Sequence, residues 1–278
     1  MFQNRKIIIA TKHKKEQVIG PIIEKELGVR YFTDESFDTD YLGTFTGEIV
    51  RILDPIACVR EKCMEGMRLH QCELGIASEG SFGPHPQVFF VNANEEILIL
   101  IDKKNNLEII AREISTETNF NSMEINTEKD LITFAKAANF PSHAIILRKS
   151  NSERIDVFKG IHDLDELIKR FNYLHKKYQT VWAETDMRAM HNPMRMKVIE
   201  KATLQLIQKI KSSCLNCQTP GFSVVKTKKG LKCNLCGSPT NSLLSIIWGC
   251  AKCSFEKEEF YPNQKTSEDP MYCEYCNP

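Results

Sequence analysis

Residues 74–102 read LGIASEGSFGPHPQVFFVNANEEILILID, and this stretch decides the fold that we expect. Its first four residues are apolar and predict a short strand, after which the polar, glycine-containing stretch 78–86 predicts a loop. The runs 87–91 and 95–102 have the composition of strands. The segment Asn92-Ala93-Asn94 joins them, and because asparagine tolerates the positive φ of tight turns, a hairpin is expected.

The predicted loop brings three chemically useful side chains to the end of a strand. Glu79 supplies a carboxylate, Ser81 a hydroxyl and His85 an imidazole, and the glycines let a ligand approach the backbone closely. We interpret the loop as the centre of an active site, although a well-hydrated turn explains the same residues. His85 is a candidate proton shuttle because imidazoles exchange protons near neutral pH; a plain loop histidine is the alternative.

The N-terminal segment has the pattern of a strand followed by a phosphate-binding turn. Residues 6–10 predict a buried strand, and a helical pattern begins after residue 15. At such a junction the helix dipole and the backbone amides attract anions. A solvated basic turn is the alternative. The side chains expected to bind phosphate here are those of Thr11, Lys12, His13 and Lys14, with Ser81 from the loop.

Length and composition limit the class of protein. The chain has 278 residues, a formal net charge of +1 and 42% apolar residues, which suits one large domain or a large and a small one. It contains no apolar run of eighteen residues, so no membrane span and no membrane partner are predicted. The apolar run near the N-terminus is too short for a signal peptide. We therefore expect a cytoplasmic protein with reduced cysteines.

Eight of the eleven cysteines form four C-x-x-C pairs in the last 65 residues. Two such pairs supply the four thiolates of one tetrahedral zinc site, so the pattern predicts two zinc ions with a structural role. Consecutive pairing is favoured, and an interleaved pairing, first with third and second with fourth, is the alternative. The predicted ligands are Cys214, Cys217, Cys233, Cys236, Cys250, Cys253, Cys273 and Cys276.

The charge of this tail makes nucleic acid an unlikely partner. From Ser212 onward there are seven lysines and six acidic residues, and thiolates that outnumber the charges of their metal ions would leave the tail negative. A phosphate backbone requires a basic surface. A protein partner or a homodimer is therefore the better expectation.

A dense polar segment, residues 184–195, precedes the last predicted helix. Within it, Asn192-Pro193 provides an N-cap and a first-turn proline for a helix to about residue 212. A solvated linker explains this composition. The alternative is that the segment folds back over the preceding domain, where Arg188 and Arg195 would clamp a phosphate, because arginine binds phosphate in a bidentate manner.

These patterns predict an α/β fold in which a mixed sheet with flanking helices is followed by a linker helix and a C-terminal double zinc ribbon. The expected boundaries are 1–178 for the α/β phosphate-binding domain, 179–212 for the polar linker and helix, and 213–278 for the ribbons.

Several strings along the chain resemble an uncharacterised bacterial family. They are IATKHKKE, SEGSFGPHP, FPSHA and ETDMRAMHNPMR, together with the closing cysteine pairs. The resemblance spans nearly the full length. It supports the domain boundaries and implies no particular chemistry.

Roughly the first 105 residues also resemble the inosine-triphosphate pyrophosphatase superfamily of nucleotide hydrolases. Those enzymes begin with a strand, a Ser/Thr-x-Asn-x-x-Lys phosphate turn and a helix. Thr11 and either Lys14 or Lys15 occupy the matching places, while His13 stands where the asparagine is expected. The acidic metal loop of the superfamily resembles residues 77–83. The acidic loop and helix that come before it could correspond to Glu48, Asp54 and Arg60.

Together these features suggest metal-dependent hydrolysis of a nucleotide or related phosphorylated small molecule. In that mechanism Glu48 and Glu79 would hold Mg²⁺, which activates an attacking water. The alternative is a non-catalytic nucleotide sensor or a partner-docking scaffold. An enzyme should bring Glu48, Glu79 and Lys12 into one pocket, whereas a scaffold should leave Glu79 solvated and expose a large apolar patch on the ribbons.

Overall fold

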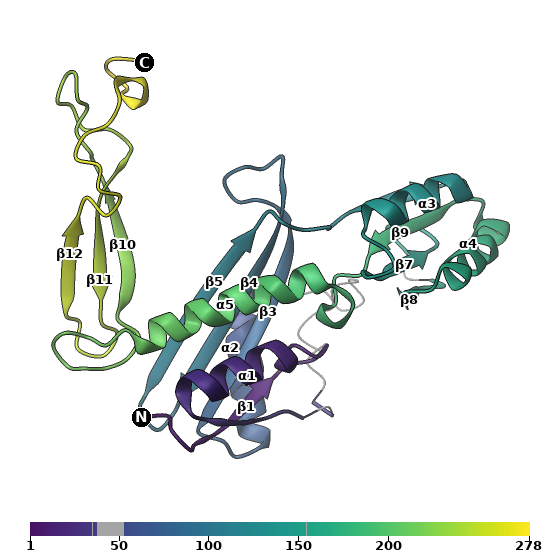
Figure 1. Ribbon diagram of the computed structural model, residues 1–278, viewed down its shortest axis with the longest axis horizontal. Coiled ribbons are helices and arrows are strands. Elements are labelled where there is room, and N and C mark those ends of the chain that lie inside the picture. The colour runs from purple at the N-terminus through teal and green to yellow at the C-terminus, as the bar shows by residue number, and fades with distance from the viewer. Residues whose placement is uncertain (35, 38–52, 154) are drawn as a thin grey trace. The chain divides into compact units, whose positions relative to one another are not determined.

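The structure, a computed structural model, describes residues 1–34, 36–37, 53–153 and 155–278. Contacts divide the chain into a larger unit, Met1–Ile207, and a smaller unit, Gln208–Pro278. The fold is mixed α/β, and Figure 1 shows its three sheets. Glu48 lies outside the described residues.

A five-stranded mixed sheet forms the first part of the larger unit. Its strands are β1 (Lys6–Ala10), β2 (Arg30–Phe32), β3 (Leu74–Pro84), β4 (Asn92–Asp102) and β5 (Leu107–Ser115). They lie in the order β2-β1-β3-β4-β5, with β1 parallel to β2 and β3, and with β4 antiparallel to both of its neighbours. β1 ends opposite Ala77, whereas β3 runs on.

Three helices accompany this sheet: α1 (Glu16–Leu27), α2 (Pro55–Leu69) and α5 (Pro193–Lys211). α2 begins at its predicted N-cap, where the Asp54 carboxylate accepts hydrogen bonds from two backbone N–H groups of the first turn. Its apolar face, including Val59, Cys63 and Met67, shares a core with alternate residues of β1, β3 and β4. Figure 1 shows α1 and α5 across the near side of the sheet.

The central stretch differs from the sequence prediction. β3 and β4 form one long hairpin, so most of the expected loop 78–86 is strand, and the expected strand 87–91 lies in the connecting turn. Gly80 shows why the prediction was wrong. A Cβ atom there would overlap the side chains of Arg195 and Glu96. This glycine therefore makes room for two charged side chains within a strand.

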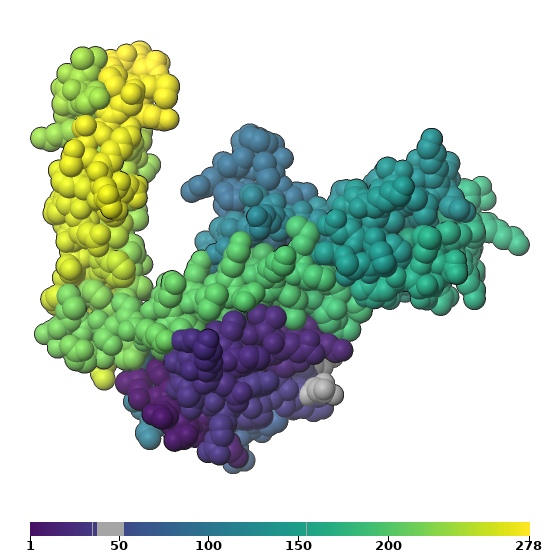
Figure 2. All heavy atoms as spheres, in the orientation of Figure 1, coloured from purple at the N-terminus to yellow at the C-terminus, as the bar shows by residue number. Residues whose placement is uncertain are grey.

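The turn between β3 and β4 is organised by His85. Its Nδ1 accepts hydrogen bonds of 3.1 Å from the backbone N–H groups of Gln87 and Val88. Phe89 and Phe90 are each 80% exposed in this turn, which projects from the sheet in Figures 1 and 2. One ring nitrogen of His85 is thus occupied in holding the turn, which favours the loop-histidine interpretation over the proton shuttle.

A second, four-stranded sheet completes the larger unit, with α3 (Glu128–Ala137) and α4 (Leu164–Tyr178) contributing to its core. The strand order is β6-β9-β7-β8, and every neighbouring pair is antiparallel. The expected polar linker begins inside this sheet, because β9 lies between two other strands and buries alternate residues. The strands are β6 (Ser122–Ile125), β7 (Ile145–Arg148), β8 (Phe158–Ile161) and β9 (Val181–Thr185).

The smaller unit is a three-stranded antiparallel sheet with a group of cysteines at each end. Its strands, in spatial order, are β10 (Ser223–Lys229), β11 (Leu243–Gly249) and β12 (Glu256–Phe260). Over the described part of the chain, no helix combines the length and the apolar character that crossing a membrane requires.

Candidate metal centres and a buried charged site

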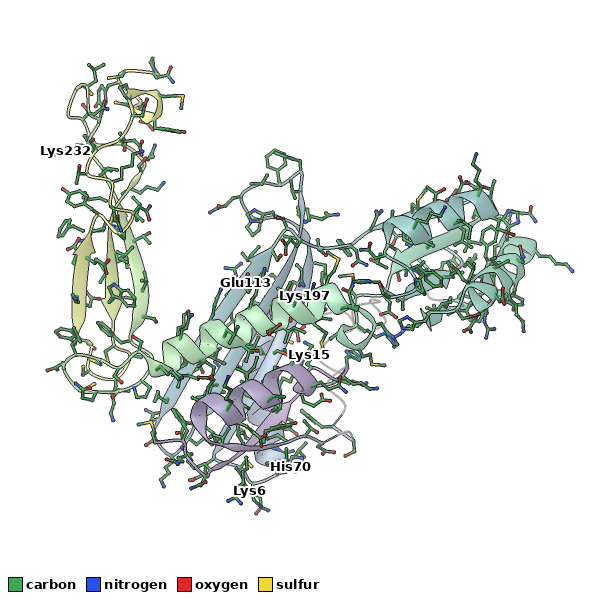
Figure 3. The ribbon with its side chains drawn as sticks, viewed as in Figure 1. Lys6, Lys15, His70, Glu113, Lys197 and Lys232 are labelled. Carbon is green, nitrogen blue, oxygen red and sulfur yellow. The ribbon has the colours of Figure 1, made fainter. Side chains whose placement is uncertain are left out.

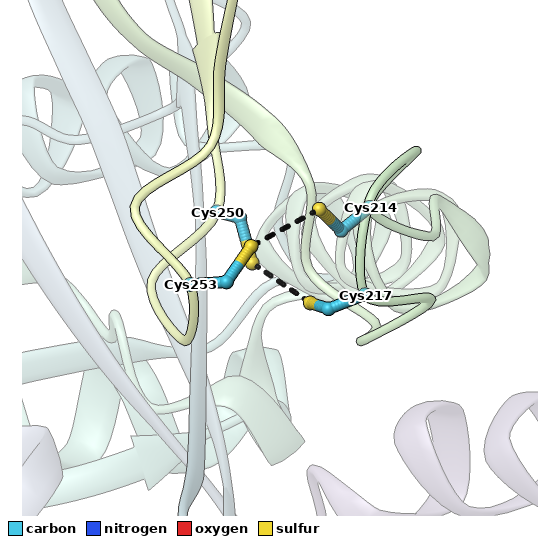
Figure 4. Close-up of side chains that lie close together, drawn as sticks. All are labelled: Cys214, Cys217, Cys250 and Cys253. Atoms are coloured by element: carbon cyan, nitrogen blue, oxygen red, sulfur yellow. Dashed lines mark hydrogen bonds between the residues drawn. The ribbon is translucent and has the colours of Figure 1, made fainter.

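Eight cysteines form two groups of four, and the sulfur atoms within each group lie within 4.8 Å of one another. In the first group, Sγ of Cys214 lies 3.7 Å from Sγ of Cys253, and Sγ of Cys217 lies 3.6 Å from Sγ of Cys250 (Figure 4). Four sulfurs placed ~2.3 Å from a central zinc ion are ~3.8 Å apart. The spacing therefore fits a tetrahedral metal ion.

The second group has the same geometry. Sγ of Cys233 lies 3.9 Å from Sγ of Cys276, and the corresponding distance between Cys236 and Cys273 is 3.6 Å. In both groups a backbone N–H two residues after the first cysteine points to its sulfur at 3.4 Å. Such amides favour thiolates over thiols. Both groups can hold metal ions, as the cysteine pattern predicts.

The C-x-x-C pairs combine in the interleaved order, so the prediction that favoured consecutive pairs was wrong. The first pair meets the third, and the second meets the fourth. The antiparallel sheet explains this result. β10 carries the chain away from the first pair, β11 carries it back, and β12 carries it away again. Successive pairs therefore alternate between the two ends of the sheet.

A second candidate site lies where β1 ends and α1 begins. Five charged side chains are almost completely buried there, with exposures of 4% for Lys15, 8% for Lys62, 6% for Glu79, 0% for Glu96 and 1% for Arg195. Lys15 directly precedes α1, and the others come from α2, β3, β4 and α5. Figure 3 places Lys15 at the start of α1, with Lys6 and His70 towards the opposite end of the sheet.

Two short ion pairs organise the cluster. Nζ of Lys62 lies 2.6 Å from Oε2 of Glu79, and Nε of Arg195 lies 2.6 Å from Oε1 of Glu96. Arg195 also donates a 2.5 Å hydrogen bond to the carbonyl of Met187. The polar segment 184–195 thus contacts the sheet through Arg195, and the phosphate clamp of Arg188 and Arg195 stays a prediction.

Lys15 occupies the space beyond the end of β1. Its ammonium group donates a 3.4 Å hydrogen bond to the carbonyl of Ser78 and lies 3.9 Å from Oε2 of Glu96. That oxygen and the Ser78 hydroxyl are buried without a hydrogen-bond partner among the described residues. Lys15 is also the N-cap residue of α1, where the helix dipole opposes a positive charge.

The pKa values of two basic side chains at the turn between β1 and α1 are lowered. Burial and the Arg195 charge lower the pKa of Lys15 to about 7, despite the opposing effect of Glu96. Burial, followed by the charges of Lys15, Arg195, Arg188 and Lys12, lowers the pKa of His13 to about 3. Burial is the largest cause of both shifts, the neighbouring positive charges add to it, and His13 is neutral there.

The structure distributes the other predicted site residues around this cluster. Thr11 is buried, Lys12 and His13 are half-buried, and Lys14 is exposed. Ser81 is half-buried on β3. Arg188 is held by Asp186, with nitrogen–oxygen distances of 3.0 Å and 2.6 Å, and it is close enough to lower the pKa of His13.

Sequence reasoning missed Lys62 and Glu96 and named Lys15 only through a resemblance. Two signals were present. Lys62 directly precedes the buried Cys63 and follows the inward-facing Val59 by three residues on α2. Glu96 lies at an inward position of β4, within an otherwise apolar strand pattern. A charged residue at an inward position is a site candidate because burial of an isolated charge is costly.

Comparison with known proteins identifies the family. A family model for a domain of unknown function, DUF6671, matches residues 62–278. The chain belongs to this family. The match includes both cysteine groups and four of the five cluster residues, and it begins after the turn between β1 and α1. This agrees with the expected resemblance to an uncharacterised family.

One similar solved structure is that of protein VC0702 from Vibrio cholerae. The two chains are 9% identical, the match covers 74% of this chain and 94% of that chain, and the TM-score is 0.32. At this score the likeness supports no conclusion. No curated protein matches. The resemblance to the inosine-triphosphate pyrophosphatase superfamily therefore stays an expectation.

Proposed function

We propose that the chain binds a nucleotide or a related phosphorylated small molecule at the buried charged cluster and hydrolyses it in the presence of Mg²⁺. One observation carries the proposal: among the residues that the structure describes, the basic side chains of Lys15, Lys62 and Arg195 are buried with two carboxylates, Glu79 and Glu96, and Lys15 lacks a short ion pair of the kind that the other two make. A buried charge without a counter-charge is costly. A phosphate group supplies the missing negative charge.

Two helix N-termini add to the attraction for an anion. Lys15 caps α1, and Arg195 lies in the first turn of α5, where its backbone N–H donates a 2.9 Å hydrogen bond to Oδ1 of the N-cap residue Asn192. The positive ends of both helix dipoles therefore lie at the cluster. A bound phosphate would interact with the two dipoles and with the ammonium of Lys15.

Mg²⁺ fits this site best as an ion that arrives with the ligand. The carboxylate of Glu79 already interacts with Lys62 at 2.6 Å, so the described residues hold an ammonium where a resident metal would lie. Mg²⁺ commonly uses one or two carboxylates together with the oxygens of a bound phosphate. We keep Glu79 as its proposed ligand, with Glu48 as the second, and the ion would neutralise phosphate charge.

Binding of inorganic pyrophosphate and of a nucleotide panel tests the site, and release of phosphate or pyrophosphate with Mg²⁺ tests hydrolysis. Lys15→Met should lower the affinity for pyrophosphate at least tenfold. Lys6→Met, an exposed lysine towards the opposite end of the sheet, is the matched control and should leave it unchanged. Equal effects of the two substitutions would contradict the proposed site.

The second candidate function is a sensor that binds the same ligands without cleaving them. The burial of Glu79 at 6% exposure argues against a scaffold in which this residue is solvated, but it is compatible with sensing. Tight binding with no phosphate or pyrophosphate release from any nucleotide would favour the sensor.

We also propose zinc as the metal of both cysteine groups. Four thiolates in a closed tetrahedral arrangement are typical of structural zinc, and such sites require reduced cysteines, which a compartment such as the cytoplasm provides. Metal analysis of protein purified without chelators should give two zinc ions per chain. Disulfides in place of metal would contradict this assignment.

A further inference from the structure

Two histidines outside the charged cluster form a directly hydrogen-bonded pair. Nε2 of His162 lies 2.9 Å from Nδ1 of His191, and Nδ1 of His162 lies 2.9 Å from the carbonyl oxygen of Pro141. His162 follows β8, and His191 ends a short 3₁₀ helix after β9. Neither residue is engaged by the anion site described above.

The chemistry of the partners fixes where the protons lie. The Pro141 carbonyl can only accept, so Nδ1 of His162 must donate. In the neutral ring, Nε2 of His162 then carries a lone pair and accepts the proton of His191 Nδ1. Nε2 of His191 is consequently left without a proton. The pair thus presents one defined basic nitrogen.

That basic nitrogen and a terminal nitrogen of Arg188 both lie against Gly160. A Cβ atom built on Gly160 would lie 3.1 Å from Nε2 of His191 and 3.3 Å from a terminal nitrogen of Arg188. Gly160 has a φ of +72°, a conformation that side chains disfavour, and because it carries no side chain the two nitrogens can approach its backbone this closely. Gly160, Arg188 and His191 are all half-buried, so each is partly exposed to solvent.

Arg188 is connected to the charged cluster through its neighbour in sequence, because the carbonyl of Met187 accepts a 2.5 Å hydrogen bond from Arg195. Arg188 lowers the pKa of His13, and Lys14 lowers the pKa of His191. Asp186 holds the Arg188 guanidinium with both carboxylate oxygens and also accepts a 3.1 Å hydrogen bond from the backbone N–H of Gly160. The basic nitrogen and Arg188 are therefore neighbours, and both belong to the segment 184–195, which contacts the cluster through Arg195.

We propose that His191 is the general base of the reaction and that His162 is a positioning residue that fixes its tautomer. The inference rests on the proposed hydrolase function. Nε2 of His191 takes a proton from a water molecule while the water oxygen forms a bond to phosphorus. The bond from phosphorus to the leaving phosphate oxygen breaks, and that oxygen departs with the electron pair. The bound proton then passes to solvent.

The groups around His191 keep it neutral and able to accept this proton. Burial lowers its pKa most, and the charges of Arg188, His162 and Lys14 lower it further, against the raising effect of Asp186. The two rings cannot both carry a full positive charge, because two N–H groups would then face each other across 2.9 Å. The pair takes up a single proton.

Nitrogen-15 NMR of the histidine side chains tests the geometry without any turnover. His162 and His191 should both be Nδ1–H tautomers, whereas neutral histidine in water favours the Nε2–H form. Added inorganic pyrophosphate should shift the His191 signals and leave those of His85, in the distant turn, unchanged. An Nε2–H tautomer at His191 would overturn the inference even if pyrophosphate binds, whereas absent binding would count against the proposed function.

Kinetics with the best substrate of the nucleotide panel test the role. His191→Gln should lower kcat by ~10²–10⁴-fold, the usual contribution of a general base, with KM nearly unchanged and without the acidic limb of the pH–rate profile. His162→Gln can still donate to Pro141 and accept from His191, so it should retain most activity, while His162→Ala should not. Full activity of His191→Gln, or equal losses in His191→Gln and the control His85→Gln, would overturn the proposal.

Discussion

At the scale of single residues, the charge of Lys15 destabilises the folded state. Its pKa of about 7 in the folded protein, against 10.5 as its ordinary value, means that folding disfavours the protonated form. The penalty is complete below pH 7 and disappears as the pH rises towards 10.5, where the unfolded chain also loses this proton. The wild-type chain should therefore gain stability from this group between these two pH values.

Lys15→Met removes that penalty. A shift of this size corresponds to a free energy on the order of 2–5 kcal/mol, so the variant should unfold at higher denaturant concentration than the wild type at pH 6. The difference should shrink as the pH approaches 10. Chemical denaturation at several pH values measures this, and a variant less stable than the wild type at pH 6 would show that the Lys15 ammonium stabilises the fold.

The pair of Lys62 and Glu79 supports a second prediction. Glu79→Gln leaves the buried Lys62 ammonium without its counter-charge and should destabilise the protein by about 3–5 kcal/mol. The double variant Lys62→Met/Glu79→Gln should recover most of this loss, because no unpaired charge is left. A double-mutant cycle by denaturant unfolding measures the coupling. A loss of stability in the double variant equal to the sum of the losses in Glu79→Gln and Lys62→Met would mean that the pair does not interact energetically.

At the scale of elements, amphipathic and capped segments could be predicted and site-bearing strands could not. The helix expected from Asp163 to Tyr178 is α4, because Leu167, Phe171 and Leu174 give a regular apolar stripe with polar residues between them. The full length of β3 was not predicted, because Ser78, Glu79 and Gly80 are polar or small and yet are buried in the strand. A sequence pattern assigns such residues to a loop, since it cannot see the charges that compensate them.

The candidate site could likewise be predicted only where its residues are close together in the sequence. The turn between β1 and α1 was found from local chemistry, because a strand, a basic turn and a helix are adjacent in sequence. The contribution of Glu96 could not be found in this way. Its partner Arg195 is almost a hundred residues away, and only the packing of α5 against the sheet brings the two together.

A single cysteine substitution should disrupt one cysteine group and leave the other intact. Cys233→Ser should remove one zinc ion and unfold the end of the small sheet that holds Cys236, Cys273 and Cys276, while the first group keeps its metal. Structural zinc contributes ~10–16 kcal/mol of apparent binding free energy in small peptides, so the effect should be local and large. Metal analysis should give one zinc ion per chain. Loss of both ions would show that the two groups are coupled through the sheet.

At the scale of the whole molecule, the interleaved pairing has a consequence for biosynthesis. Under consecutive pairing, a first metal ion could be captured as soon as Cys236 had left the ribosome. In this fold the first group must wait for Cys253, and the second for Cys276. Two adjacent cysteine pairs that emerge early could also form a competing, non-native metal complex. Correct loading therefore depends on the β10–β11 hairpin forming before metal is bound tightly, so a slow supply of zinc during translation should favour the native pairing.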